Sequence, residues 1–231
     1  MKVNTDRAEM IKLKHKLIRI VKISALSCVM LMMQRTYINA QSNYMILVEQ
    51  ALTAVKHDSL LHAEKLYKQA LDAEPTNYTN TLIFTNLIRL QESQMKFTDA
   101  IETCNQALEQ FPNSEVFLSM RGNIFFRMKQ YARALQDYEQ VLSRHPGEYK
   151  AMLGKCRTRM EMGQVDEAYN LINILVTAYP ESAYLYFMRA EIESRTSRPE
   201  LARIDIDKAI EMEPSNDDYK KWKQTFLLKE K

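Results

Sequence analysis

Residues 115–148 read EVFLSMRGNIFFRMKQYARALQDYEQVLSRHPGE, and this stretch decides the fold because its pattern occurs five times in the protein. One alanine and one proline mark each occurrence, and the proline always follows the alanine by twelve residues. The alanines are Ala63, Ala100, Ala134, Ala168 and Ala202, and the prolines are Pro75, Pro112, Pro146, Pro180 and Pro214. Successive marks are 37 residues apart once and then 34 residues apart three times. Two residue types that share one period predict an array of repeated units.

The segment between each alanine and its proline has the spacing of a helix. In the third occurrence, Val141 and Leu142 lie seven and eight residues after Ala134, so all three fall on one helical face. The proline that follows cannot continue the helix and therefore ends it. Only 4 Gly and 6 Pro occur in 231 residues, which leaves too little turn chemistry for a β-sandwich or barrel. The sequence therefore predicts an all-α fold.

The residues at the marked positions resemble the tetratricopeptide repeat (TPR) family, whose 34-residue unit is a helix–turn–helix. The third unit shows the family's signature residues as Leu118, Gly122, Phe125, Ala134, Tyr138 and Pro146. The resemblance implies a right-handed α-solenoid of five helix–turn–helix units, at 44–77, 81–114, 115–148, 149–182 and 183–216, within an array that spans 41–216. The sequence departs from the pattern where Arg121, Lys155 and Arg189 replace the usual leucine.

The last segment, residues 217–231, is predicted to be a C-terminal capping helix. Acidic residues stand at its start and lysines at its end, which matches the helix dipole. Tyr219, Trp222 and Phe226 recur at helical spacing and would cover the exposed end of the last repeat. A repeat array needs such a cap to remain soluble.

Residues 1–40 have the order of a secretory signal peptide. A cationic stretch from Lys12 to Lys22 precedes the apolar run 23–33, and Ala40 supplies a small residue for cleavage. The length of this run, eleven residues, is about half of the ~20 that a membrane-spanning helix needs. An uncleaved N-terminal anchor and a buried helix of a cytoplasmic protein remain as alternatives, and Met10 is an alternative start. The main expectation is an exported protein, periplasmic or associated with the cell envelope.

Charge and composition argue against nucleic-acid binding and catalysis. The first forty residues carry a charge of +6 while the total is +3, so the remainder is mildly acidic and lacks the clustered basic face that phosphates need. No phosphate loop, nucleophile elbow or metal-ligand spacing occurs. Cys104 and Cys156 fall at packing positions. We therefore expect no enzyme activity, no catalytic residue, no cofactor and no metal.

The family's concave surface supplies the candidate binding site. The resemblance places the ninth residue of successive first helices on that surface, as Arg89, Asn123 and Arg157 in the second to fourth repeats. Two guanidinium groups with an amide between them suit an extended acidic segment or the C-terminus of a polypeptide. The candidate partner-binding residues are Arg89, Asn123, Phe126, Arg157, Met160, Tyr184 and Phe187. The family's chaperone-tail clamp is not matched, because Val48 and Leu52 replace its polar residues in the first repeat.

These patterns predict a scaffold that binds a protein or extended peptide in its groove. The alternative is a membrane-tethered structural or assembly subunit of an envelope complex, which would pack through its convex face or its Trp222 end. The residues do not specify the oligomeric state.

The leader hypothesis predicts that residues 1–40 are absent from the mature protein. N-terminal sequencing of protein isolated from its native host should begin at or near Gln41. An intact Met1 or Met10 in a soluble cytosolic fraction would contradict export.

Overall fold

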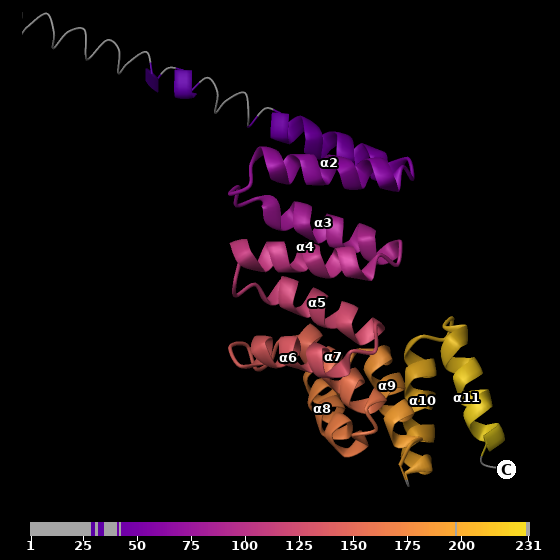
Figure 1. Ribbon diagram of the computed structural model, residues 1–231. Coiled ribbons are helices and arrows are strands. Elements are labelled where there is room, and N and C mark those ends of the chain that lie inside the picture. Colours follow the sequence, from indigo (N-terminus) through magenta and orange to yellow (C-terminus); the bar gives the residue numbers. More distant parts are fainter. Residues whose placement is uncertain (1–28, 31, 35–40, 42, 197, 230–231) are drawn as a thin grey trace, which may run out of the picture. The chain divides into compact units, whose positions relative to one another are not determined.

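The structure is a computed structural model that describes residues 29–229, apart from residues 31, 35–40, 42 and 197. The segment 1–40, interpreted above as a leader, therefore lies mostly outside the described residues. All regular secondary structure in the described part of the protein is helical (Figure 1), which confirms the all-α solenoid class.

The helices follow the repeat pattern of the sequence. A first helix covers residues 43–56. The others are α2 (Leu60–Ala73), α3 (Asn80–Ser93), α4 (Phe97–Gln110), α5 (Glu115–Arg127), α6 (Tyr131–Leu142), α7 (Tyr149–Glu161), α8 (Val165–Ala178), α9 (Ala183–Glu193), α10 (Pro199–Met212) and α11 (Asp217–Lys229).

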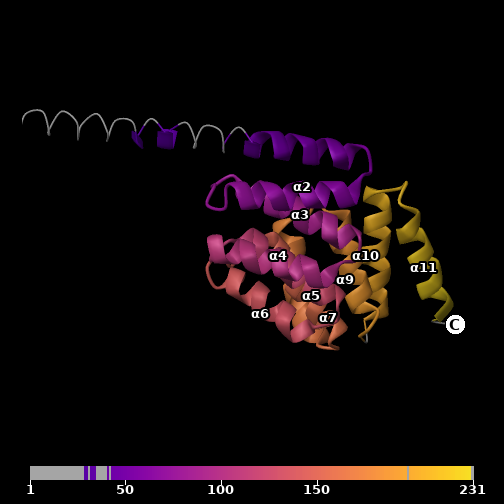
Figure 2. The same ribbon diagram turned by 45° about the horizontal axis from the view of Figure 1, so that its top comes forward.

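The chain divides into two compact units, Met1–Ile83 and Phe84–Lys231, with the boundary inside α3. In the second unit α5 packs against α6, α7 against α8 and α9 against α10, and each pair also contacts the next pair along the sequence. Figures 1 and 2 both show α10 lying between α9 and α11. Consecutive helices are thus neighbours in space, as expected for a repeat array.

The five marker alanines are all completely buried. Around Ala134, one core cluster contains Leu118, Phe125, Tyr138 and Val141. The small side chain lets the backbones of the first and second helices approach closely, so that the larger neighbours interdigitate. The alanines that recur with the repeat period are therefore required for close packing of the helices, as the sequence predicts.

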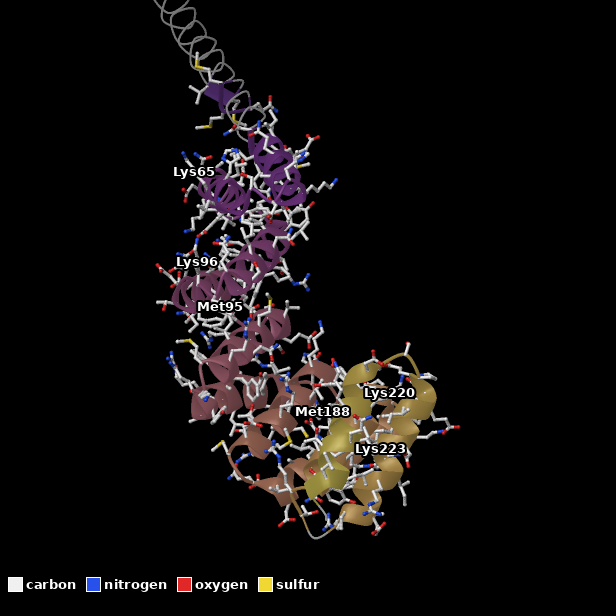
Figure 3. The ribbon with its side chains drawn as sticks, turned by 90° about the vertical axis from the view of Figure 1, so that its right-hand side faces the viewer. Lys65, Met95, Lys96, Met188, Lys220 and Lys223 are labelled. Carbon is white, nitrogen blue, oxygen red and sulfur yellow. The ribbon has the colours of Figure 1, made fainter. Side chains whose placement is uncertain are left out.

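The turns inside the repeats share one backbone conformation. A residue with positive φ follows the first helix in each of four repeats, namely Asp58, Met95, Lys129 and Gly163. In the third repeat the N–H of Lys129 donates to the carbonyl of Phe126 (2.9 Å), and that of Gln130 to the carbonyl of Phe125 (2.8 Å). This pair of hydrogen bonds forms a Schellman cap, which favours glycine at the position with left-handed backbone conformation. Met95, labelled in Figure 3, holds that position without being glycine.

The first unit contains an additional contact made by the three-residue insertion after the first repeat. The hydroxyl of Tyr44 lies 2.6 Å from Thr79 Oγ1 and donates to Asn80 Oδ1 at 3.2 Å. The amide of Asn80 in turn donates to the carbonyl of Glu74 at 2.8 Å. The longer spacing between the first two repeats therefore carries its own hydrogen bonds.

The capping helix α11 packs on the last repeat through its aromatic side chains. Tyr219 stacks on Phe187 with ring centroids 4.8 Å apart, and Trp222 meets the same ring edge-on at 5.8 Å. Trp222 in turn stacks on Phe226 at 5.2 Å. Lys220, on the same helix (Figure 3), is exposed. These contacts agree with the predicted capping role of the three aromatic residues.

Arginines at the usual leucine position are used in buried ion pairs. Arg121 binds both carboxylate oxygens of Asp137, at 2.9 and 2.7 Å, and donates to Asn105 Oδ1 at 2.7 Å. Two repeats later Arg189 binds Asp205 in the same bidentate way and donates to Asn173 Oδ1 at 3.0 Å. Both aspartates are buried. At these two positions the departure from the family pattern is therefore compensated by a bidentate ion pair and one further hydrogen bond.

A second acid lies close to the Arg189–Asp205 pair. Glu193 is only 2% exposed, and burial, followed by the charge of Asp205, raises its pKa to about 7. Arg189 and Arg198 oppose this rise. One carboxylate oxygen of Glu193 is buried without a hydrogen-bond partner. Glu193 is therefore held closer to its protonated form than an exposed glutamate would be.

The packing around Ala134 gives a test of the repeat register. Ala134→Leu should overpack the third repeat and lower the free energy of unfolding by about 1–3 kcal/mol. Ala132→Leu is a matched control, because Ala132 lies on the same helix and is exposed. Chemical denaturation of both variants measures the difference. Equal stabilities of Ala134→Leu and Ala132→Leu would refute the proposed close helix crossing.

The raised pKa of Glu193 gives a pH-dependent prediction. Folded protein holds the proton on this carboxyl up to about pH 7, whereas the unfolded protein releases it near the ordinary value of 4.5. The contribution of Glu193 to stability should therefore decline as the pH rises from the unfolded to the folded pKa, by about 1.4 kcal/mol per pKa unit. Glu193→Gln should remove this decline and stabilise the protein at about pH 8 relative to the parent.

Thermal unfolding of both proteins across this pH range measures the effect. Glu181→Gln, a change at an exposed glutamate, should leave the parent profile unaltered. A Glu193→Gln profile parallel to that of the parent would exclude a raised pKa at this position.

Candidate functional site: a face of the first helices

The candidate site lies on the first helices of successive repeats in the second unit. Arg89 on α3, Asn123 on α5 and Arg157 on α7 occupy equivalent positions, and all three side chains are exposed. Glu191 is the equivalent, half-buried residue of α9. We call the surface formed by these four residues the first-helix face.

Asn123 is held in one orientation by a buried tyrosine. The hydroxyl of Tyr138 donates to Asn123 Oδ1 at 2.7 Å, and Tyr138 itself is completely buried. Room for its ring comes from two glycines: a Cβ atom on Gly122 would lie 2.7 Å from Tyr138 Cε1, and one on Gly154 would lie 2.6 Å from the same atom. Burial raises the pKa of Tyr138, so its hydroxyl stays protonated and remains a donor.

Arg157 is also pre-positioned. Its guanidinium carbon lies 4.8 Å from the centroid of the Phe126 ring, a cation–π geometry. Phe126 is packed in turn against Tyr131 at 5.8 Å. The predicted site residues Phe126 and Arg157 therefore contact each other. The arginine keeps its charge on the surface while its orientation is limited by the ring.

A cavity of about 420 Å³ lies between α3, α5 and α7. Arg89 and Asn123 both line it, so the structure brings these two predicted residues together. Its full lining is Arg89, Glu92, Glu115, Val116, Ser119, Met120, Asn123, Glu148 and Lys150.

One predicted site residue lies in the core, and that expectation is corrected. Met160 is only 7% exposed and belongs to the core cluster with Ile172 and Leu185, because the neighbouring repeat covers it. Phe187 is half-buried, and its ring contacts Tyr219 and Trp222 of α11. The capping helix therefore occupies part of the Phe187 surface that the sequence assigns to a partner.

Tyr184 remains accessible at the C-terminal end of the array. Its side chain is 37% exposed, and its ring lies 6.5 Å from that of Phe187. Burial raises the pKa of Tyr184, and the positive charge of Arg157 partly offsets the rise. Tyr184 therefore lies within range of the positive charge of Arg157, on the same helix as Phe187, which contacts α11.

Sequence reasoning missed Ser119 and Tyr138 as site residues. Ser119 is buried, and its hydroxyl has no hydrogen-bond partner although it lines the cavity. Ser119 is the fifth residue of its repeat, a position that the family resemblance puts on the concave surface, but the sequence does not reveal that its hydroxyl lacks a partner. The signal for Tyr138 was available, because Gly122 and Gly154 are two of only 4 glycines and both stand on first helices.

The described residues contain no group of three or more His, Cys, Asp and Glu side chains that could hold a metal ion. Cys104 and Cys156 are both free and buried, and burial raises the pKa of each thiol. The Cys156 thiol donates to the carbonyl of Ala168 at 3.3 Å. These positions fit a packing role. Within the described part of the protein, no helix has the length and apolar character needed to cross a membrane.

Comparison with known proteins agrees with this architecture. Two tetratricopeptide repeat family models match the chain, at residues 125–192 and 183–216. The chain is 28% identical over 131 residues to protein O-mannosyl-transferase TMTC1 from Homo sapiens. That match covers 57% of this chain and only 15% of TMTC1, so the chain spans a small part of this relative.

Solved structures show the same fold at low sequence identity. MamA from Desulfovibrio magneticus RS-1 has a TM-score of 0.66 and 16% identity, covering 76% of this chain and 97% of that one. YrrB, described as a TPR protein with an unusual peptide-binding site, has a TM-score of 0.60 and 17% identity, covering 77% and 90%. The chain therefore contains tetratricopeptide repeats, which the family models match over residues 125–216. Its fold is that of a protein-interaction scaffold.

Proposed function

We propose that this protein is a scaffold whose first-helix face holds an extended, acidic segment of a protein partner. The observation that carries the proposal is the row formed by Arg89, Asn123 and Arg157, three exposed hydrogen-bond donors at equivalent positions of successive repeats. Regular spacing of donors suits the regular spacing of groups along an extended peptide. Residues 1–40 have a cationic stretch followed by an apolar run, and from this order alone we propose that the protein acts in the periplasm or at the cell envelope.

The pre-positioning of the donors supports the proposal. Tyr138 fixes the amide of Asn123, and Phe126 limits the orientation of Arg157. Groups that are already ordered lose less conformational entropy when a ligand binds. A partner carboxylate would therefore meet donors that need little rearrangement.

A second candidate function rests on the first unit. There several exposed side chains along the helix 43–56 are apolar, with Met45 60%, Leu52 41% and Val55 39% exposed. They recur at i, i+7 and i+10, which places them on one helical face. An apolar stripe of this kind favours packing against another protein, as in an assembly subunit.

The main proposal predicts the effect of removing both arginines. Arg89→Ala combined with Arg157→Ala should weaken capture of the native partner at least tenfold, since each charge-assisted contact contributes roughly 1.5–3 kcal/mol. The melting temperature should change by only a few degrees, because both side chains are exposed. Pull-down from the native host, followed by quantitative mass spectrometry, measures capture by the parent and by the variant.

The matched control removes the same charge elsewhere in the second unit. Arg144→Ala combined with Lys221→Ala serves this purpose, because both side chains are exposed on other helices or turns. Arg198 is unsuitable as a control, because its guanidinium stacks over Tyr169 at 4.2 Å and is partly buried. If Leu52→Glu abolishes capture while the double arginine variant keeps it, the assembly function replaces the groove function.

A further inference from the structure

A buried cluster of charged groups lies where α9, α10 and the turn between them meet. Glu193, the last residue of α9, is 2% exposed, and Asp205 of α10 is 5% exposed. The two carboxyl groups share a hydrogen bond. One of them must carry a proton, because an ionised carboxylate accepts hydrogen bonds and has none to donate.

Arg189 determines which of the two acids holds that proton. Its Nε and Nη2 atoms donate to the two carboxylate oxygens of Asp205, and its Nη1 atom donates to Asn173 Oδ1 at 3.0 Å. This pairing keeps Asp205 ionised and engages all three nitrogens of Arg189 with groups other than Glu193. The proton therefore belongs to Glu193, in agreement with the raised pKa of this carboxyl.

Two atoms of this cluster are buried without a hydrogen bond to any residue that the structure describes. One is an acceptor, Glu193 Oε2, and the other is a donor, Nη1 of Arg198, which precedes α10 directly. The guanidinium of Arg198 is held over the ring of Tyr169 on α8, with its carbon 4.2 Å from the ring centroid. A buried donor and a buried acceptor without partners both cost free energy. Because the two are complementary, they point to a second arrangement in which they bond to each other.

The charged groups that act on Glu193 come from its own helix, from α10 and from the turn between them, and they are Arg189, Asp205 and Arg198. From α8, Tyr169 meets the cluster through its contact with Arg198. Arg195 lies in the same turn, but it is exposed and pairs with Glu161 at 3.5 Å. Within the described residues, Arg198 alone of the cations acting on Glu193 has a buried nitrogen left to donate.

We propose that Glu193 and Arg198 form a proton-controlled latch between the fourth and fifth repeats. While Glu193 is protonated, it donates to Asp205 and leaves Arg198 stacked on Tyr169, which is the arrangement described above. When the proton passes to water, Asp205 repels the Glu193 carboxylate, which then accepts a hydrogen bond from Arg198 Nη1. Arg198 gives up the ring of Tyr169 in this exchange, so the start of α10 loses this contact with α8.

A pH titration of the full-length protein, labelled with ¹³C and ¹⁵N and followed by NMR, tests the exchange. The side-chain carboxyl carbon of Glu193, Nε of Arg198 and the ring resonances of Tyr169 are recorded on both sides of neutral pH. All three should change with one midpoint, at about pH 7. Glu193→Gln can donate to Asp205 but cannot ionise. In that variant the Arg198 and Tyr169 resonances should stay constant.

Two further variants distinguish the latch from a cluster that is only structural. Arg198→Ala removes the second partner of Glu193 and should raise its titration midpoint by about 1 pH unit, as expected for the loss of one nearby opposite charge. Tyr169→Leu removes the ring that competes for Arg198 but keeps apolar bulk, and it should lower the midpoint. Arg195→Ala removes the same charge from the same turn. It is the matched control and should leave the midpoint of Glu193 unchanged.

Hydrogen exchange measures the consequence for the junction of the two repeats. In the parent, protection factors of the first amides of α10 should fall above about pH 7 relative to those of α6, whereas Glu193→Gln should keep them constant. Resonances of Arg198 and Tyr169 that do not follow the titration of Glu193 would overturn the latch, and the parent alone provides this result even where a variant fails to fold. Midpoints that move in the same direction in Arg198→Ala and Tyr169→Leu would overturn it as well.

Discussion

The close approach of helices at small residues is the constraint on which the rest of the structure depends. The five marker alanines are fully buried, and larger side chains fill the space on either side of them. Gly122 and Gly154 extend the same constraint to the first helices, because Cβ atoms there would collide with Tyr138. The ring of Tyr138 thus fills the space that two glycines leave, and its buried hydroxyl donates to Asn123, whose side chain is exposed. Core packing and the candidate site are therefore physically connected.

The protein separates its polar residues into two groups. Arg121 and Arg189 are paired with buried aspartates inside the array, where each also receives an asparagine partner. Arg89 and Arg157 remain on the surface instead. A buried charge needs polar partners, and the arginines of the first group have them within the array. The second group is free to act on another molecule, which is why an interaction function follows from the array rather than from any reactive residue.

The repeat architecture could be predicted because packing constraints recur with the period of the sequence. The alanine at each helix crossing and the proline after each second helix specify the helices locally, and neither depends on distant residues. The positions of Arg89, Asn123 and Arg157 followed from the same period. The residues Arg121 and Arg189 appeared as departures from the pattern, and their aspartate partners became evident only from the packed helices.

Other site residues could not be predicted, because their environment depends on which neighbour covers them. Met160 occupies a groove position in the repeat pattern, yet it is buried in the core. Phe187 is half-buried and contacts the capping helix, which the repeat period does not predict. Ser119 gains its significance from lacking a partner, and a sequence does not record which hydrogen bonds are missing. The repeat period thus predicts which residues share a helical face, but not which of them stay exposed in the folded protein.

A partner that binds on the first-helix face of the second unit must come within reach of a reactive group placed there. Site-specific photo-crosslinking tests this binding most directly, with a photoreactive residue placed either at Val116, which lines the cavity, or at Gln136, which is exposed on α6. We expect a crosslink to the partner from position 116 in the native host and none from position 136. A crosslink from position 136 alone would contradict binding on this face.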